Sequence, residues 1–161
     1  MNDTIYFYEA TKKNGFLSNF YESPIVIDGE LWRTVEHYFQ AMKFPDYPEY
    51  QQTIREVNTP AISKRLGRSR KYKIRPDWEE VKDKIMYKAL RIKFMSNGEL
   101  CSMLIDTDDS LLVEHSRDIY WADGGSNKGV SQDKMRGKNR LGVLLMAVRD
   151  EMKMYRSLID S

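Results

Sequence analysis

The longest periodic segment of the chain spans residues 78–96 and predicts an amphipathic helix. Apolar side chains recur there at helical spacing, in a stripe formed by Trp78, Val81, Ile85, Ala89 and Ile92. Such a stripe is stable only when it is buried against other elements. The segment therefore predicts a packed core with this helix at its surface.

Shorter segments supply the other elements of that core. Asp28-Gly29 accepts the positive φ values of a type I′ turn and predicts a hairpin of strands 25–27 and 30–32. Thr34, Thr59 and Asn139 are expected to cap helices, and Gly67 is expected to end one. Further helices are predicted over 35–44, 48–57, 60–67, 99–105 and from 139 on, and further strands over 4–8, 111–113 and 119–121. The order predicts a single α+β domain over residues 1–161, mostly helical, with a small, mainly antiparallel sheet.

Composition excludes several classes of protein. The chain has 161 residues, of which 41% are hydrophobic and 31% charged, so it is not a wholly disordered chain. The first residues have neither a basic nor an apolar leader segment, and one cysteine, Cys101, leaves no internal disulfide, so we expect a cytoplasmic protein. With only His37 and His115 besides that cysteine, a zinc cluster is not expected, and we predict no metal and no cofactor.

Positive charge is concentrated although the net charge is only +2. The segment from Lys64 to Arg75 carries seven basic residues and no acidic one, and a second basic stretch runs from Lys128 to Arg140. Two such clusters on a nearly neutral chain favour an anionic ligand such as a phosphate, with a solvated basic surface as the alternative.

The helix expected over 35–44 holds the most informative side chains. Glu36, Gln40 and Lys43 share one face because they are spaced i, i+4, i+7. The helix is rich in aromatic residues, which favours burial on most sides. Burial would move the pKa values of Glu36 and Lys43 toward neutrality and suit them to acid–base and nucleophilic roles. A solvent-facing charged stripe is the alternative, and His37, about 100° away, is expected to be a core residue.

Two other segments could hold a ligand. Trp121-Ala-Asp-Gly-Gly125 combines an aromatic face, a carboxylate and flexible backbone, which suits a nucleoside, although a buried tryptophan before a polar turn fits as well. Glycine and basic residues over 137–142 come just where a helix is expected to begin, which favours a phosphate there.

Several of these segments together resemble the NADAR family, also called YbiA-like. The resemblance rests on Phe16-Leu-Ser-Asn-Phe20, on Trp32-Arg-Thr-Val-Glu-His-Tyr-Phe-Gln-Ala-Met-Lys-Phe44, on Leu66-Gly-Arg68, on Tyr120-Trp121 and on Gly137-Lys-Asn-Arg-Leu-Gly142. It covers nearly the whole chain. Ala122 stands where the resemblance would place glycine, and the loop 125–137 is longer than in compact members.

The resemblance implies an α+β fold and an N-glycosidase. The implied substrates join ribose C1 to an exocyclic amine and carry phosphate: a phosphoribosylamino-pyrimidine intermediate of riboflavin synthesis, or ADP-ribosylated guanine, free or in nucleic acid. The implied catalytic residues are Glu36, Lys43 and Asp123. The implied substrate-binding residues are Asn19, Phe20, Gln40, Arg68, Trp121, Gly124 and Asn139.

Two mechanisms and two other functions remain open at this stage. Lys43 could form a Schiff base at C1 while Glu36 shuttles protons, or water could attack directly with Glu36 as the base. A non-catalytic ADP-ribose or nucleotide-binding module is one alternative function. A nucleic-acid-binding protein using residues 64–75 is the other. The oligomeric state is not predicted.

Overall fold

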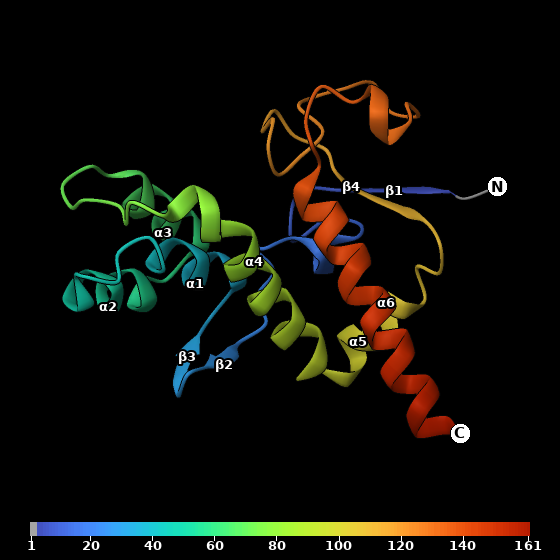
Figure 1. Ribbon diagram of the computed structural model, residues 1–161, viewed down its shortest axis with the longest axis horizontal. Helices are drawn as coiled ribbons and strands as arrows, with labels where there is room; N and C mark the ends of the chain where they lie inside the picture. The colour runs from blue at the N-terminus through green and yellow to red at the C-terminus, as the bar shows by residue number, and fades with distance from the viewer. Residues whose placement is uncertain (1–2) are drawn as a thin grey trace. The chain divides into compact units, whose positions relative to one another are not determined.

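The computed structural model describes residues 3–161, and it has the predicted α+β composition (Figure 1). The chain divides into two compact units, which we describe separately: unit 1 comprises residues up to 18 and residues 94–161, and unit 2 comprises residues 19–93. Among the described residues, no helix is long and apolar enough to span a bilayer. The elements are β1 (Thr4–Phe7), η1 (Gly15–Leu17), β2 (Ile25–Ile27), β3 (Glu30–Trp32), α1 (Val35–Ala41), α2 (Pro48–Glu56), α3 (Pro60–Arg68), α4 (Trp78–Met95), α5 (Gly98–Ile105), β4 (Leu111–Glu114), η2 (Gln132–Lys134) and α6 (Arg140–Asp160).

Unit 2 contains the predicted hairpin. Strands β2 and β3 are antiparallel, with Ile25 opposite Trp32. Asp28 and Gly29 have φ values of 52° and 82°, as a type I′ turn requires. The buried residues alternate with exposed ones along β2, so one face of the hairpin packs inward.

Three short helices complete the part of unit 2 that carries the candidate site. Helix α1 packs against α2 and α3, which also contact each other, and the three lie together in Figure 1. Thr34 caps α1 as predicted, since its side chain accepts a hydrogen bond from the backbone N–H of His37. The helix ends at Ala41, three residues before the predicted end, because Lys43 and Phe44 donate to carbonyls three residues back and tighten the last turn.

Gly67 does not end its helix, contrary to the prediction. Helix α3 continues through this residue to Arg68, and Gly67 keeps a negative φ. A methyl group on Gly67 would lie 1.8 Å from Oε1 of Gln40 in α1. The glycine is therefore needed for the close approach of two helices, and a left-handed helix end is not its role.

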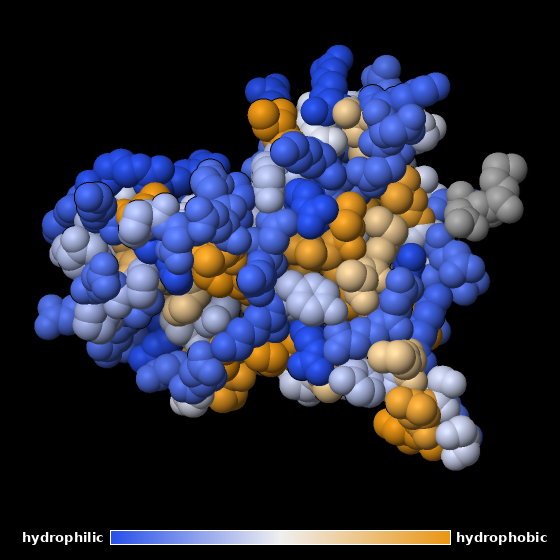
Figure 2. Space-filling model, viewed as in Figure 1, coloured by the Kyte–Doolittle hydropathy of each residue, from blue (hydrophilic) through white to orange (hydrophobic). Residues whose placement is uncertain are grey.

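Unit 1 is built around a parallel strand pair that the sequence did not predict. Strands β1 and β4 pair with Thr4 opposite Leu111, and α6 packs on β4 while α5 packs on α6 (Figure 1). The four strands found in residues 3–161 thus form two pairs, one antiparallel and one parallel. At the C-terminal end of α6, Met154, Leu158 and Ile159 are exposed, and Figure 2 shows apolar surface there.

Residues 119–121 were predicted as a strand and form a turn instead. Oδ1 of Asp118 accepts hydrogen bonds from the backbone N–H groups of Tyr120 (2.8 Å) and Trp121 (2.7 Å). An aspartate side chain that accepts hydrogen bonds from two successive backbone N–H groups stabilises a turn. Those N–H groups are then not available for pairing with a neighbouring strand.

Candidate active site

Glu36 is a buried carboxyl group in the first turn of α1. Glu36 is only 6% exposed, because every residue of α1 is buried against neighbouring elements. Its backbone N–H donates to the carbonyl oxygen of Asn19 (3.2 Å). The alternative of a solvent-facing charged stripe is therefore wrong: Gln40, one turn on, is also buried at 4% exposure.

The surroundings of Glu36 act on its pKa in opposite directions. Burial raises the pKa above its ordinary value, because the charged form loses hydration. Positive charges on Lys64, Lys43 and Arg68 favour the charged form and lower the pKa, as does the hydrogen bond from Nε2 of Gln40 to Oε1 of Glu36 (3.3 Å). The net effect is a raised pKa, so the protonated form of Glu36 persists to a higher pH than in an ordinary glutamate.

Lys43 lies just beyond the end of α1 and has a pKa lowered to about 8. Burial is the largest cause. Arg70, Arg68 and Lys64 add to it by repulsion, while Glu36 opposes it. Nζ of Lys43 lies 3.5 Å from the carbonyl oxygen of Gly67, at the long end of the hydrogen-bond range, and 5.8 Å from the ring centre of Trp78. At pH 7 about a tenth of such a lysine is neutral and nucleophilic.

The acid-free stretch supplies the cations around this pair. Arg68 is exposed at the end of α3 and acts electrostatically on both Glu36 and Lys43. Lys64, one turn earlier, is the strongest charged neighbour of Glu36, and its Nζ lies 5.8 Å above the ring of Phe20. Neither Lys64 nor Arg70 was among the predicted site residues, although both belong to the acid-free stretch that was singled out.

Asn19 and Phe20 reach the same region of unit 2. Phe20 contacts Lys64, as described above. Nδ2 of Asn19 donates to the sulfur of Met86 (3.5 Å), which is a weak acceptor. Oδ1 of Asn19 is buried and has no hydrogen-bond partner within residues 3–161, so its acceptor capacity is unused.

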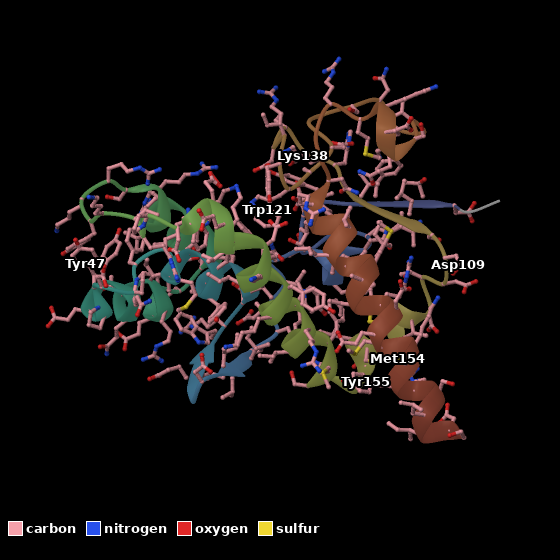
Figure 3. The ribbon with its side chains drawn as sticks, viewed as in Figure 1. Tyr47, Asp109, Trp121, Lys138, Met154 and Tyr155 are labelled. Carbon is pink, nitrogen blue, oxygen red and sulfur yellow. The ribbon has the colours of Figure 1, made fainter. Side chains whose placement is uncertain are left out.

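The remaining predicted residues belong to unit 1, and Trp121 lies on the turn that Asp118 closes. Trp121 is partly buried, its ring packs edge-on against that of Tyr120, and its carbonyl oxygen accepts from Leu141 at the start of α6. Figure 3 shows Trp121 and Lys138 near that helix start. Gly124 has a φ of +70°, and a methyl group there would lie 2.9 Å from the backbone nitrogen of Gly137, so it must be glycine for conformational reasons.

Asp123 holds its own loop together. Its carboxylate is 1% exposed and accepts hydrogen bonds from Nδ1 of His115 (2.7 Å) and from the backbone N–H groups of Ser116 and Gly125. Because the carboxylate is 1% exposed, a substrate hydroxyl would reach it only if its surroundings moved. The predicted role of Asp123 toward ribose stays a prediction. Ala122 has a negative φ, so a glycine is not needed there.

Asn139 precedes α6 as predicted, but its side chain does not cap the helix. The residue is fully buried in a left-handed conformation with a φ of 50°. Oδ1 accepts from the N–H of Glu114 (3.2 Å), and Nδ2 donates to the carbonyl of Leu112 (2.9 Å) and to Oε1 of Gln132 (3.2 Å). The side-chain amide of Asn139 therefore links β4 to the segment before α6, and it supplies hydrogen-bond partners to backbone groups of β4.

His37 is a core residue, as expected. Its ring lies between the hydroxyl of Thr34 (2.8 Å from Nδ1) and the carbonyl of Val57 (2.9 Å from Nε2), and burial lowers its pKa. Within residues 3–161 no cluster of histidine, cysteine and acidic residues has the arrangement of a metal site.

Comparisons with known proteins agree with the resemblance. The NADAR domain matches residues 6–153, across both units. The chain is 46% identical over 154 residues to the N-glycosidase YbiA of Escherichia coli, covering 94% of this chain and 91% of that protein. It is 37% identical to the N-glycosidase Npun_R5314 of Nostoc punctiforme, with 96% of each chain covered.

Two further matches extend this result. The NMR structure of E. coli YbiA superposes with a TM-score of 0.83 at 44% identity, covering 97% of this chain and 89% of that one. The riboflavin biosynthesis protein VVA0006 of Vibrio vulnificus is 38% identical over 95% of this chain, which corresponds to 40% of that protein. With a family match over nearly its whole length and N-glycosidase relatives of which it covers 91% and 96%, the chain belongs to the NADAR domain family.

Proposed function

We propose that this protein is an N-glycosidase that hydrolyses the bond between ribose C1 and an exocyclic amine of a phosphorylated or ADP-ribosylated base. The observation that carries the proposal is the pairing of a buried Glu36 carboxyl of raised pKa with Lys43, whose pKa is about 8. The names of the relatives, which are N-glycosidases and a riboflavin biosynthesis protein, support the bond type and favour a phosphoribosylamino-pyrimidine.

Cleavage of such a substrate can begin with opening of the ribose ring. The lone pair of the exocyclic nitrogen opens the ribose ring and leaves an imine at C1, while the ring oxygen takes up a proton. Neutral Lys43 then attacks C1, so that a bond from Nζ forms and the bond to the base amine breaks. The resulting Schiff base is hydrolysed by water, which returns the free lysine and releases the sugar.

Glu36 is suited to the proton transfers in this sequence. Protonated, it gives its proton to the ring oxygen or to the departing amine, and ionised, it accepts one from the attacking water. Burial raises its pKa, which favours the protonated form, and the nearby cations favour the ionised form.

The charge of this region supports a phosphorylated substrate. Lys43, Lys64 and Arg68 act on the Glu36 carboxyl group and Arg70 acts on Lys43, so positive charge is in excess beside that one carboxyl group. A phosphate group would compensate that excess, and an arginine would bind it with a charge-assisted pair of hydrogen bonds. Asn19, with its unpartnered amide oxygen, would accept from a ribose hydroxyl.

Two experiments test the proposal. Incubation with a phosphoribosylamino-pyrimidine and, separately, with ADP-ribosylated guanine should release the free base from at least one of them. Binding of either compound without release of base would support a non-catalytic binding module instead. Glu36→Gln should lower kcat about a hundredfold or more and leave the dissociation constant within a few fold, since only the acid–base function is lost.

Borohydride separates the covalent route from direct attack by water. Reduction during turnover should leave the sugar attached to Lys43, and a tryptic peptide map should place the added mass on that residue. If turnover proceeds and borohydride leaves no adduct, water attacks directly and Lys43 acts only through its charge.

A further inference from the structure

Gly67 touches the side chain that holds Glu36. Its α carbon faces Gln40 so closely that an added methyl group would lie 1.8 Å from Oε1, 2.6 Å from Cδ and 3.0 Å from Cβ of Gln40. Gly67 is itself buried, in the last turn of α3. The contact therefore fixes how closely α3 approaches α1 in the middle of the candidate site.

The two ends of the Gln40 amide have different tasks. Nε2 donates to Oε1 of Glu36 at 3.3 Å. Oε1 lies against Gly67 and has no hydrogen-bond donor within residues 3–161. Gln40 is 4% exposed, so its amide is enclosed by protein, and the surface of Gly67 limits where Nε2 can point.

Gly67 also touches the second member of the pair, since its carbonyl oxygen accepts a long hydrogen bond from Nζ of Lys43, at 3.5 Å. The neighbouring positions on α3 carry the cations Lys64 and Arg68, which act on Glu36. One backbone position is thus in contact with Gln40 and Lys43, and it lies between the two cations that α3 contributes.

We propose that Gly67 is a positioning residue for the reaction: by lacking a side chain, it lets Gln40 reach Glu36 and orient the carboxyl group. The inference rests on the role proposed for Glu36. It predicts that a methyl group at position 67 displaces the Gln40 amide from Glu36, because the two atoms closest to that methyl group, Oε1 and Cδ, belong to the end of a flexible side chain. Alanine is also a better helix residue than glycine.

The decisive measurement is the titration of the Glu36 carboxyl carbon by ¹³C NMR, in Gly67→Ala, in Gln40→Ala and in the double variant. The groups that face Glu36, namely Lys43 beyond α1 and Lys64 and Arg68 on α3, are unchanged in all three. Loss of the Gln40 hydrogen bond should raise the Glu36 pKa in each variant, and the double variant should match Gln40→Ala alone. Gly98→Ala is the matched control, since a methyl group there meets nothing within 4 Å.

Kinetics give a second readout. Gly67→Ala and Gln40→Ala should each lower kcat about tenfold with KM within a few fold, and the double variant should lose no more than Gln40→Ala. Effects that simply add, or a Gly67→Ala protein with the wild-type Glu36 titration, would overturn the proposal. If Glu36→Gln keeps full activity, the proposed function fails, whereas the NMR titration still decides the role of Gly67.

Folding of the variants is also informative. Should Gly67→Ala fail to fold, the double variant still removes Oε1 and Cδ of Gln40, the two atoms closest to the new methyl group, and its folding with the titration of Gln40→Ala supports the proposal. If Gln40→Ala folds and the double variant does not, the obstacle at position 67 is not the Gln40 amide, and the proposal is wrong.

Discussion

Nε2 of Gln40 donates to Oε1 of Glu36 across 3.3 Å, one turn apart on a helix whose residues are all buried. This bond places the carboxyl group at the side of α1 that faces α3. Its charge is balanced there by cations rather than by water. Glu36 and Lys43 are therefore coupled through the same positive surroundings.

Lys43→Arg tests the nucleophile. A guanidinium group stays protonated and forms no Schiff base, so base release should fall below detection, as it should in Lys43→Ala. In the wild type the rate should rise as the pH approaches 8, where Lys43 loses its proton. Base release is followed by absorbance or chromatography. Near-normal turnover by the arginine variant would exclude a covalent role.

Arg68→Ala tests phosphate recognition. The variant should weaken binding of the phosphorylated substrate by about one to two powers of ten, because a charge-assisted hydrogen bond contributes about 1.5–3 kcal/mol. Binding of the dephosphorylated analogue should hardly change. Arg65→Ala removes an equally basic, exposed residue of α3 that does not act on Glu36, and it should bind both compounds normally. Equal losses on both compounds in Arg68→Ala would reject the phosphate role.

Lys93 makes the stability of the protein depend on pH. It is 1% exposed, and burial lowers its pKa to about 7 in the folded state, against 10.5 ordinarily. Between these values the unfolded chain binds the proton that the folded chain has lost. The free energy of unfolding should therefore rise with pH in this window, on the order of 1 kcal/mol per pH unit. Below pH 7 the buried lysine is charged, and the destabilisation that this burial causes is at its full size.

Denaturant titrations from pH 6 to 10 test this linkage by difference. The free energy of unfolding of Lys93→Met, relative to wild type, should fall as the pH rises, because the variant has no proton to lose at that position. Lys84→Met removes an exposed lysine of the same helix and should run parallel to wild type. A constant difference for Lys93→Met would mean that Lys93 stays charged in the folded protein.

Asn139→Gly tests whether the Asn139 side chain acts as a helix cap or links α6 to β4 through hydrogen bonds. Glycine keeps the left-handed backbone of residue 139 but loses the three side-chain hydrogen bonds. Replacing a mere cap by glycine costs only a few tenths of a kcal/mol, whereas leaving buried backbone groups unpaired costs about 1–3 kcal/mol. We expect the larger loss in chemical denaturation. Asn97→Gly, at the cap of α5, should show the smaller one.

Local patterns determined most elements of this protein. The Asp28-Gly29 turn, the caps at Thr34 and Thr59 and the bounds of α4 were all predicted at or near their positions, because each depends on neighbours within a few residues. The predicted apolar stripe of α4 is only partly buried: of its residues Ala89 alone is buried, beside Met86, Leu90 and Phe94. The motifs of the NADAR family were also present in the sequence itself, and the family match confirms them.

Tertiary structure decided the features that depend on residues far apart in the chain. The local sequence predicts that Gly67 ends a helix, and only its contact with Gln40, 27 positions earlier, shows its actual role. The local sequence likewise predicts that Asn139 caps a helix, whereas its side chain forms hydrogen bonds with backbone groups of β4. The parallel pairing of β1 with β4 joins segments more than 100 residues apart. The burial of Glu36, which sets its pKa, likewise comes from helices packed around it. The spacing of residues along α1 predicts which face of the helix carries Glu36. Only the packing of the other elements decides whether that face is exposed to water or buried in the protein.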